Sequence, residues 1–145
     1  MIRITVLGSG TSQGIPVVAC DCPVCMSDNP KDNRLRSSVL VEYDDCSVSI
    51  DVGPDFRQQM LRIGQKSIDA IVVTHEHMDH IAGLDEIRAF NFRSGSNMKV
   101  YASKSVIIRL KEQYSYIFKA SKYPGVPRVE LIEISNSPFE IGGKL

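Results

Sequence analysis

The chain has 145 residues, of which 43% are hydrophobic and 23% charged, a length that suits one compact domain and makes a second independent domain unexpected. Lys plus Arg equals Asp plus Glu, at 17 each, so the net charge gives no reason to expect binding to nucleic acid or to a membrane surface. No apolar run approaches the roughly 18 residues that span a bilayer, and the segment before the first polar loop is too short for a signal peptide. We therefore expect a cytoplasmic protein.

The first third of the sequence predicts a strand, a long loop and a hairpin. Alternating β-branched residues over Ile2–Leu7 are typical of a strand. Residues 8–36 are rich in Gly, Pro, Asp, Asn and Cys. A loop of that length in a compact domain is usually functional or held by a bound group. Two alternating runs, Ser37–Tyr43 and Cys46–Asp51, are joined by two aspartates, which predicts a hairpin.

A helix and a buried strand are predicted next. Asp55 is placed to cap a helix that runs to Ile63, and Gly64 is placed to end it. The apolar face of this helix is expected to comprise Phe56, Met60, Leu61 and Ile63. The run Ile68–Val73 is almost continuously apolar, which is typical of a strand buried on both faces.

The rest of the chain alternates between helical and strand patterns. In chain order, the predicted elements are a helix over Leu84–Phe92 closed by Ser94 and Gly95, a strand over Met98–Ala102, a helix over Ser105–Phe118, a strand over Val129–Ile134 and the opening of a hairpin over Pro138–Leu145. Predicted strands and helices alternate along the chain, and some predicted strands follow one another directly. The sequence therefore predicts an α/β fold, with helices packed on a mixed sheet.

The segment 74–80, Thr-His-Glu-His-Met-Asp-His, holds all three histidines of the chain. His75 and His77 are two apart, so in extended backbone they point the same way and can share one ion. Asp79 and His80 follow on a tightening turn, where they can face a second ion. Imidazole and carboxylate suit zinc and similar transition metals. The alternative is a solvated histidine-rich loop, but the segment follows a buried strand, where α/β sheets place their sites.

A second candidate metal site is the cluster Cys20, Cys22 and Cys25 inside the long loop. In a reducing cytosol such a cluster indicates a metal site more than a disulfide framework. Three thiolates suit a tetrahedral zinc ion that needs one more ligand. Free thiols or a redox-labile pair are the alternative. Cys46 stands alone in a strand pattern and is interpreted as a small buried apolar residue.

These motifs resemble those of a known family. His-x-His-x-Asp-His after an apolar strand resembles the metallo-β-lactamase superfamily, and Ile81–Leu84 fits its hydrolase members. Gly8–Pro16, the cysteine cluster and Asp51–Arg57 resemble, more narrowly, the PhnP-like cyclic phosphodiesterases. The Gly-Thr-x-x-Gly-x-Pro part of the first segment is shared with tRNase Z enzymes. The resemblance covers residue 1 to about residue 100.

The resemblance implies an αββα sandwich that hydrolyses a small phosphodiester or cyclic nucleotide with two divalent ions, zinc or manganese. By this similarity His75 and His77 bind the first ion, while Asp79 and His80 bind the second. Asp51 matches a carboxylate that supports the metal loop, with a strand-terminal turn residue as the alternative. The cysteine cluster resembles a structural zinc site of the same group.

Relatives of this kind supply three further active-site ligands, and a fourth ligand to the cysteine site, from a later part of the domain. The chain has no histidine after His80. We therefore expect residues 1–145 to be the N-terminal half of a truncated domain, with doubtful metal occupancy and little or no activity alone. One alternative is tRNase Z-like RNA processing, which the cysteine cluster disfavours. Another is a non-catalytic half-domain that forms a homodimer through an exposed sheet.

Overall fold

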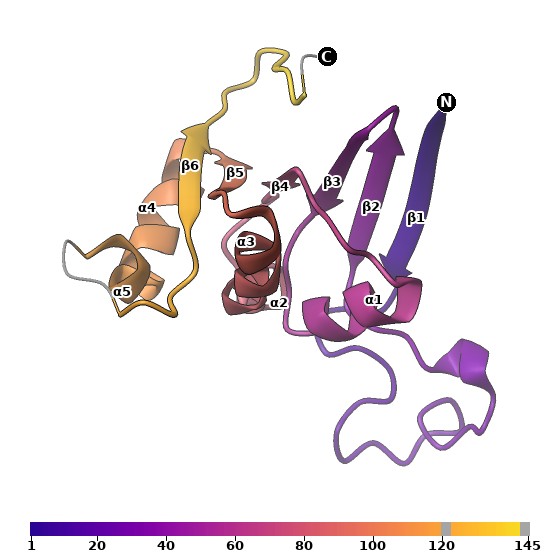
Figure 1. Cartoon of the computed structure of the whole chain (residues 1–145). Coiled ribbons are helices and arrows are strands. Elements are labelled where there is room, and N and C mark those ends of the chain that lie inside the picture. Colours follow the sequence, from indigo (N-terminus) through magenta and orange to yellow (C-terminus); the bar gives the residue numbers. More distant parts are fainter. Residues whose placement is uncertain (120–122, 143–145) are drawn as a thin grey trace.

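The computed structural model describes residues 1–119 and 123–142, and within them a six-stranded mixed sheet forms the centre of the molecule (Figure 1). In the order in which they lie side by side, the strands are β1 (Ile2–Gly8), β2 (Ser38–Tyr43), β3 (Cys46–Ile50), β4 (Ala70–Val72), β5 (Met98–Ala102) and β6 (Val129–Glu133). The pairs β1–β2 and β2–β3 are antiparallel, whereas β3 to β6 run parallel. The predicted α/β fold with a mixed sheet is confirmed.

Helices pack on one face of this sheet. These helices are α1 (Phe56–Ile63), α2 (Met78–Ile81), η2 (Leu84–Ile87), α3 (Arg88–Ser94), α4 (Lys104–Gln113) and α5 (Ser115–Phe118), whereas the short η1 (Pro30–Asp32) lies in the long loop and buries no residue. Their apolar side chains meet alternate strand residues in the main core, where Phe56, Ile71, Ile81, Val100 and Leu110 are fully buried. Each such side chain contributes about 1.5–3 kcal/mol by leaving water. Within the described residues, no helix is long and apolar enough to cross a membrane.

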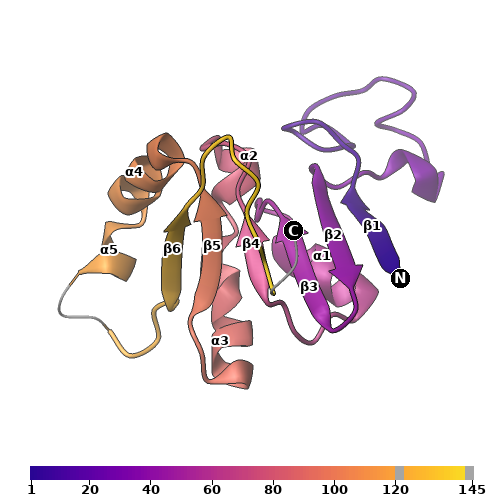
Figure 2. The same cartoon turned by 90° about the horizontal axis from the view of Figure 1, so that it is seen from above.

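The other face of the sheet carries a smaller apolar cluster. Segment 135–142 turns back over this face after β6 (Figure 2). The hydroxyl of Tyr43 donates to the carbonyl of Ile141 at 2.7 Å, and the ring of Phe139 stacks on Tyr101 with centroids 5.7 Å apart. Coverage by the described residues ends before β1, where Ile2 and Ile4 remain 69% and 66% exposed.

The start of α1 differs from the prediction in one contact. Asp55 occupies the N-cap position, but its side chain makes no capping hydrogen bond. Its carboxylate instead accepts from the backbone N–H of Arg36 at 2.8 Å and from that residue's guanidinium at 3.0 Å. An ion pair to the long loop thus replaces the local cap. Gly64 ends the helix in the left-handed conformation, as predicted, whereas Leu61 is 64% exposed and lies outside the predicted apolar face.

Two other elements differ in extent. The predicted helix over 105–118 is broken into α4 and α5 at Tyr114, which adopts φ −105° and ψ 35° while its hydroxyl donates to the carbonyl of Ile81 at 2.8 Å. The predicted strand over 68–73 is regular only over Ala70–Val72. Residues 143–145 of the predicted final hairpin lie outside the described residues.

Candidate metal centre

The carboxyl ends of two parallel strands bring together two segments that are distant in sequence. Asp51 directly follows β3, and the histidine segment begins two residues after β4. The N–H of Val52 donates to the carbonyl of His80 at 2.8 Å, and the N–H of Gly83 donates to the carbonyl of Val52 at 2.8 Å. These bonds fasten α2 to the residues after β3, at the edge where open α/β sheets bind ligands.

Two glycines permit this close approach. A Cβ atom on Gly53 would lie 2.1 Å from the carbonyl oxygen of Asp79, and one on Gly83 would lie 2.1 Å from the carbonyl oxygen of Gly53. No side chain fits at such distances, so each position requires glycine. Each glycine stands inside a segment that carries the family resemblance, but these close approaches depend on contacts that local sequence patterns do not reveal.

Asp51 is the hub of the hydrogen bonds around the histidines. Asp51 is only 4% exposed, and its backbone adopts the left-handed conformation with φ 65°. One carboxylate oxygen lies 2.7 Å from Nδ1 of His80, and the other accepts from the N–H of Thr74 at 2.8 Å. An ionised carboxylate only accepts, so Nδ1 of His80 carries a proton, and in the neutral imidazole the lone pair is then on Nε2. This is how a histidine is prepared to bind a metal through Nε2.

Asp79 and His80 present ligand atoms at a spacing that suits one ion. Nε2 of His80 lies 3.2 Å from a carboxylate oxygen of Asp79, and both side chains reach solvent. Two ligands at zinc distances of 2.0–2.1 Å and at a tetrahedral angle lie about 3.3 Å apart. The residues present therefore fit a divalent ion held between this imidazole and this carboxylate.

The other two imidazoles lie beside this pair. The ring centroid of His75 is 4.7 Å from that of His77 and 3.9 Å from that of His80. The ring of His75 therefore lies close to both other imidazoles, while the carboxylate of Asp79 lies beside Nε2 of His80.

The cysteine cluster is also assembled. One ligand atom from each of Cys20, Cys22 and Cys25 lies within 4.8 Å of the other two, and all three thiols are free. The N–H of Cys25 points at the sulfur of Cys22 at 3.5 Å, and that of Val17 at the sulfur of Cys25 at 3.3 Å. Thiolates around zinc at 2.3 Å and tetrahedral angles lie about 3.8 Å apart, so sulfur atoms gathered this closely suit that ion.

The same contacts shift the acidity of the thiols. The N–H of Cys25, with help from the thiols of Cys20 and Cys25, lowers the pKa of Cys22 to about 7. The N–H of Val17 works in the same direction on Cys25, but desolvation and the two neighbouring thiols outweigh it and raise the pKa of Cys25. Cys22 is therefore converted to a thiolate, the form that binds metal, more readily than Cys25.

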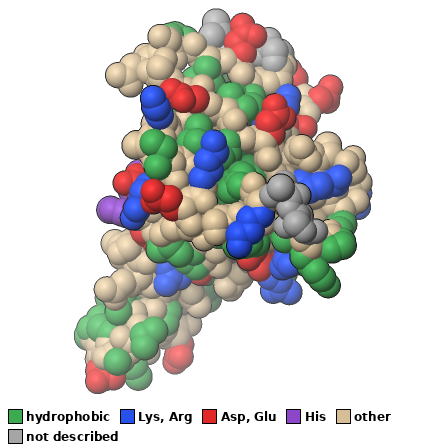
Figure 3. Space-filling view, turned by 90° about the vertical axis from the view of Figure 1, so that its left-hand side faces the viewer, with side chains coloured by type: hydrophobic (Ala, Val, Ile, Leu, Met, Phe, Trp, Pro, Cys, Tyr) green, Lys and Arg blue, Asp and Glu red, His purple; other side chains and the backbone are tan. Residues whose placement is uncertain are grey.

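The long loop that carries the cysteines forms a lobe projecting from the body. Bridges between Gly10 and Arg36 and between Ile15 and Arg34 close its base. In the space-filling view the lobe extends downward with apolar side chains on its surface, and a histidine is visible above it at the edge of the body (Figure 3). Val18 and Met26 of this lobe are 94% and 65% exposed.

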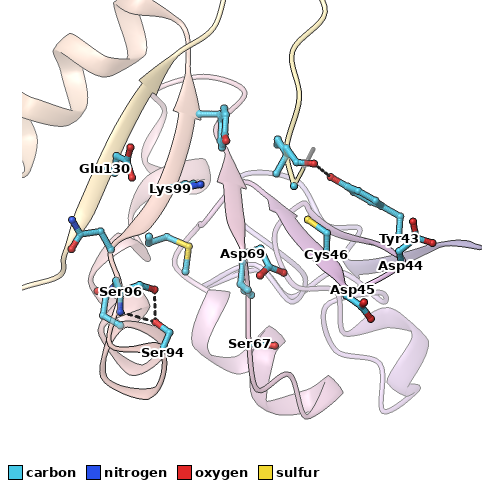
Figure 4. Close-up of a pocket in the computed structure, with 17 residues that line it drawn as sticks. Tyr43, Asp44, Asp45, Cys46, Ser67, Asp69, Ser94, Ser96, Lys99 and Glu130 are labelled. Atoms are coloured by element: carbon cyan, nitrogen blue, oxygen red, sulfur yellow. Dashed lines mark hydrogen bonds between the residues drawn. The ribbon is translucent and has the colours of Figure 1, made fainter. Parts of the chain in front are cut away.

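A cavity of about 840 Å³ lies elsewhere, at the end of the sheet opposite to the histidines (Figure 4). Its lining includes Asp69, Lys99 and Glu130 and none of the predicted metal ligands. The carboxylate of Asp69 is engaged by the N–H and the hydroxyl of Ser47, at 2.7 and 3.0 Å. We regard this cavity as part of the incompletely covered sheet face, because its best-placed carboxylate has a structural role.

Comparison with known proteins supports a family. A family model described as a β-lactamase superfamily domain matches residues 47–145. The octanoyltransferase of Porphyromonas gingivalis is 41% identical over 142 residues, which are 97% of this chain and 28% of that protein. A crystal structure of a diphosphatase from the PhnP family superposes with a TM-score of 0.87 at 44% identity, covering 97% of this chain and 54% of the other. Zinc-bound PqqB from Methylobacterium extorquens gives a TM-score of 0.74 at 25% identity, covering 97% and 48%.

The chain thus spans about half the length of the two solved structures and just over a quarter of the octanoyltransferase. The family model covers most of the chain, including Asp51 and all three histidines. Together with the fold and the motif, it confirms the resemblance found in the sequence. The chain belongs to the metallo-β-lactamase superfamily.

Proposed function

We propose that the protein hydrolyses phosphodiester or diphosphate bonds with the help of two divalent metal ions, zinc or manganese. The observation that carries this proposal is the geometry around His80. Its Nδ1 is 2.7 Å from the Asp51 carboxylate, while its Nε2 is 3.2 Å from the carboxylate of Asp79. One nitrogen is thus held by a buried anion, and the other faces the carboxylate of Asp79, with which it would hold an ion.

In this proposal His75 and His77 hold the first ion, and Asp79 and His80 hold the second. When bound, the two ions would neutralise charge on the phosphoryl oxygens and favour formation of hydroxide from water. Asp51 keeps the proton of His80 on Nδ1, and the hydrogen bonds of Val52 and Gly83 keep α2 in register with the end of β3. The remaining coordination positions would be filled by water or by groups outside residues 1–145.

The substrate class rests on two considerations. A pair of adjacent divalent ions suits a phosphoryl group, because both attacking and leaving oxygens of an in-line displacement need charge stabilisation. The similarity at 44% identity is to a PhnP-family diphosphatase, which favours a phosphoric anhydride or diester over a carboxylic substrate. Octanoyl transfer is not proposed, because the chain matches only 28% of the relative that bears that name.

The cysteine cluster is proposed to hold a structural zinc ion. Three sulfur ligands, one of them on a thiol with a pKa of about 7, suit zinc at neutral pH. Such an ion would cross-link the loop over residues 8–36, whose described part contains only the short η1 as regular helix. This role would be architectural, with no contact to substrate.

The proposal is tested with the whole protein, loaded with zinc or manganese. Bis(p-nitrophenyl) phosphate probes phosphodiester cleavage, a nucleoside diphosphate probes anhydride cleavage, and precursor tRNA probes RNA processing. His77→Ala and Asp79→Ala are expected to reduce the rate roughly a hundredfold or more, since each removes a metal ligand. The matched control is Asp45→Ala, which removes an exposed carboxylate in the β2–β3 turn. Full activity of both ligand variants would overturn the assignment, and cleavage of precursor tRNA alone would favour the RNA-processing alternative.

The homodimer hypothesis has its own measurement. The edge strand β1 carries an exposed apolar strip, formed by Ile2, Ile4 and Val6, each more than half exposed. Light scattering coupled to size exclusion would report a dimer if this strip is an interface between copies. A monomer over the accessible concentration range would exclude obligate association of this kind.

A further inference from the structure

We propose that Thr74 is a positioning residue that fixes the protonated nitrogen of His75. Its hydroxyl oxygen lies 3.0 and 2.9 Å from the two carboxylate oxygens of Asp51 and 3.0 Å from Nδ1 of His75. Thr74 therefore stands between the buried carboxylate and a second imidazole of the metal segment. This inference rests on the proposed function only in treating His75 as a metal ligand.

The direction of each hydrogen bond follows from the number of protons available. A threonine hydroxyl has one proton to donate, and an ionised carboxylate can only accept. The hydroxyl of Thr74 therefore donates to Asp51, and its oxygen accepts a hydrogen bond from Nδ1 of His75. Nδ1 of His75 must then carry that proton, so Nε2 is left with the lone pair that binds a metal.

Asp51 thus controls two imidazoles by two routes. It meets Nδ1 of His80 directly at 2.7 Å and reaches His75 through the hydroxyl of Thr74. The N–H of Thr74 also donates to Asp51 at 2.8 Å, which holds the hydroxyl in place. In the proposed centre these histidines belong to different ions, so one buried carboxylate would orient a ligand of each.

His77 provides an internal comparison. Among the described residues, its ring makes a contact with the ring of His75 but no hydrogen bond to another side chain. No hydrogen bond from the described residues therefore fixes which of its nitrogens is protonated. The chain has three histidines, so one is held directly by Asp51, one through Thr74, and one by neither.

The experiment compares Thr74→Val with Thr74→Ser. Valine keeps the β-branched shape but lacks the hydroxyl, whereas serine keeps the hydroxyl. Long-range proton–nitrogen NMR correlations of the histidine rings report which nitrogen is protonated, in metal-free protein at a pH where imidazoles are neutral. In the unsubstituted protein and in Thr74→Ser, His75 and His80 are expected to be protonated on Nδ1. In Thr74→Val, His75 is expected to lose this preference and resemble His77, while His80 keeps it.

The inference is overturned if His75 of the unsubstituted protein is protonated on Nε2, or if Thr74→Val leaves the His75 signals unchanged. The spectrum of the unsubstituted protein decides the question even if Thr74→Val fails to fold. A second readout is zinc affinity, which should fall roughly 10- to 100-fold in Thr74→Val and recover in Thr74→Ser. The NMR readout needs neither metal nor substrate. Failure of the protein to cleave phosphate compounds would therefore reject the proposed function without affecting this result.

Discussion

The carboxylate of Asp51 and Nδ1 of His80 are 2.7 Å apart although the two residues are 29 positions apart in the sequence. Both are largely buried, with 6% and 17% of their side chains exposed. A short hydrogen bond in such surroundings is stronger than one at the surface. It fixes the imidazole edge that faces Asp79 and so determines where an ion can bind.

Replacing Asp51 tests this relationship. Asp51→Asn keeps the shape of the side chain but presents an amide that cannot accept from His80 and from both donors of Thr74 at once. We expect roughly a 10- to 100-fold loss of metal affinity at the histidine segment. Cobalt(II) titration measures this, because the visible bands of nitrogen- and oxygen-bound cobalt differ from those of thiolate-bound cobalt. Asp45→Asn, which alters an exposed carboxylate, should bind as the unsubstituted protein does. Equal affinity in the two variants would show that Asp51 does not orient the ligands.

The close approach of Gly53 to the backbone of Asp79 predicts that one added methyl group lowers stability and metal binding. Gly53→Ala places Cβ 2.1 Å from the carbonyl oxygen of Asp79, so the backbone of one segment must move. Gly64→Ala is the matched control, because Gly64 has φ +69° and open space around it. That control should cost only about 1–2 kcal/mol of left-handed strain. Urea denaturation should show a greater loss for Gly53→Ala together with weakened metal binding. A smaller loss than that of the control would contradict the close approach.

Tyr114 is expected to stabilise α2, the helix that carries Asp79 and His80, through its last residue. Its hydroxyl donates to the carbonyl of Ile81 at 2.8 Å, in a buried position. Tyr114→Phe leaves that carbonyl without its partner and should cost about 1–3 kcal/mol of unfolding free energy. Tyr116→Phe, which removes a more exposed hydroxyl bonded to Asp85, should cost less. Chemical denaturation at neutral pH distinguishes the two, and equal losses would count against the structural role of the buried bond.

The stability contributed by Tyr114 is expected to depend on pH. Desolvation and then the negative charge of Asp85 raise the pKa of Tyr114 above its ordinary value. A pKa raised by folding means that the stabilisation is present below the unfolded value, near 10, and is lost as pH rises through the folded value. The unsubstituted protein should therefore lose its advantage over Tyr114→Phe on the alkaline side of pH about 10. Unfolding free energies of both proteins across this range measure the difference, which should stay constant if Tyr114 is not buried.

Cysteine alkylation tests the state of the cluster. In metal-free protein the lowered pKa of Cys22, about 7, means that its thiolate fraction rises through neutral pH. Its rate of reaction with iodoacetamide should rise with a midpoint near that pKa, ahead of Cys25, whose pKa is raised. Peptide mass spectrometry assigns the modified residues. Added zinc should protect Cys20, Cys22 and Cys25 and leave Cys46 unaffected, and loss of protection at only one of the three would contradict a shared ion.

Much of this protein could be predicted from local patterns. The alternation in Ile2–Leu7 and in the hairpin gave strands close to their observed bounds, because side chains on a strand point to opposite faces with period two. The strand over Met98–Ala102 was predicted without error. The spacing of the histidines and cysteines indicated two clusters of metal-binding side chains, since ligand chemistry depends on residue type and short spacing.

Contacts between distant segments could not be predicted in the same way. The hydrogen bond from Tyr114 to Ile81 spans 33 residues and coincides with a break that helical periodicity alone does not indicate. Asp55 has the sequence of a cap, yet its carboxylate is taken by Arg36, 19 residues earlier. In both cases a tertiary partner outweighs a local preference worth about 1 kcal/mol.

The sequence by itself determined the fold class, the family and the identity of the candidate ligands, because residue type and short-range spacing carry that information. Only the tertiary structure decided which of these groups act together. It brought Asp51, which ends one strand, against Thr74 and His80, which follow another. It also required glycine at positions 53 and 83, where two backbones meet. The physical reason is that the proton positions on the imidazoles depend on hydrogen bonds formed only when the parallel strands pair.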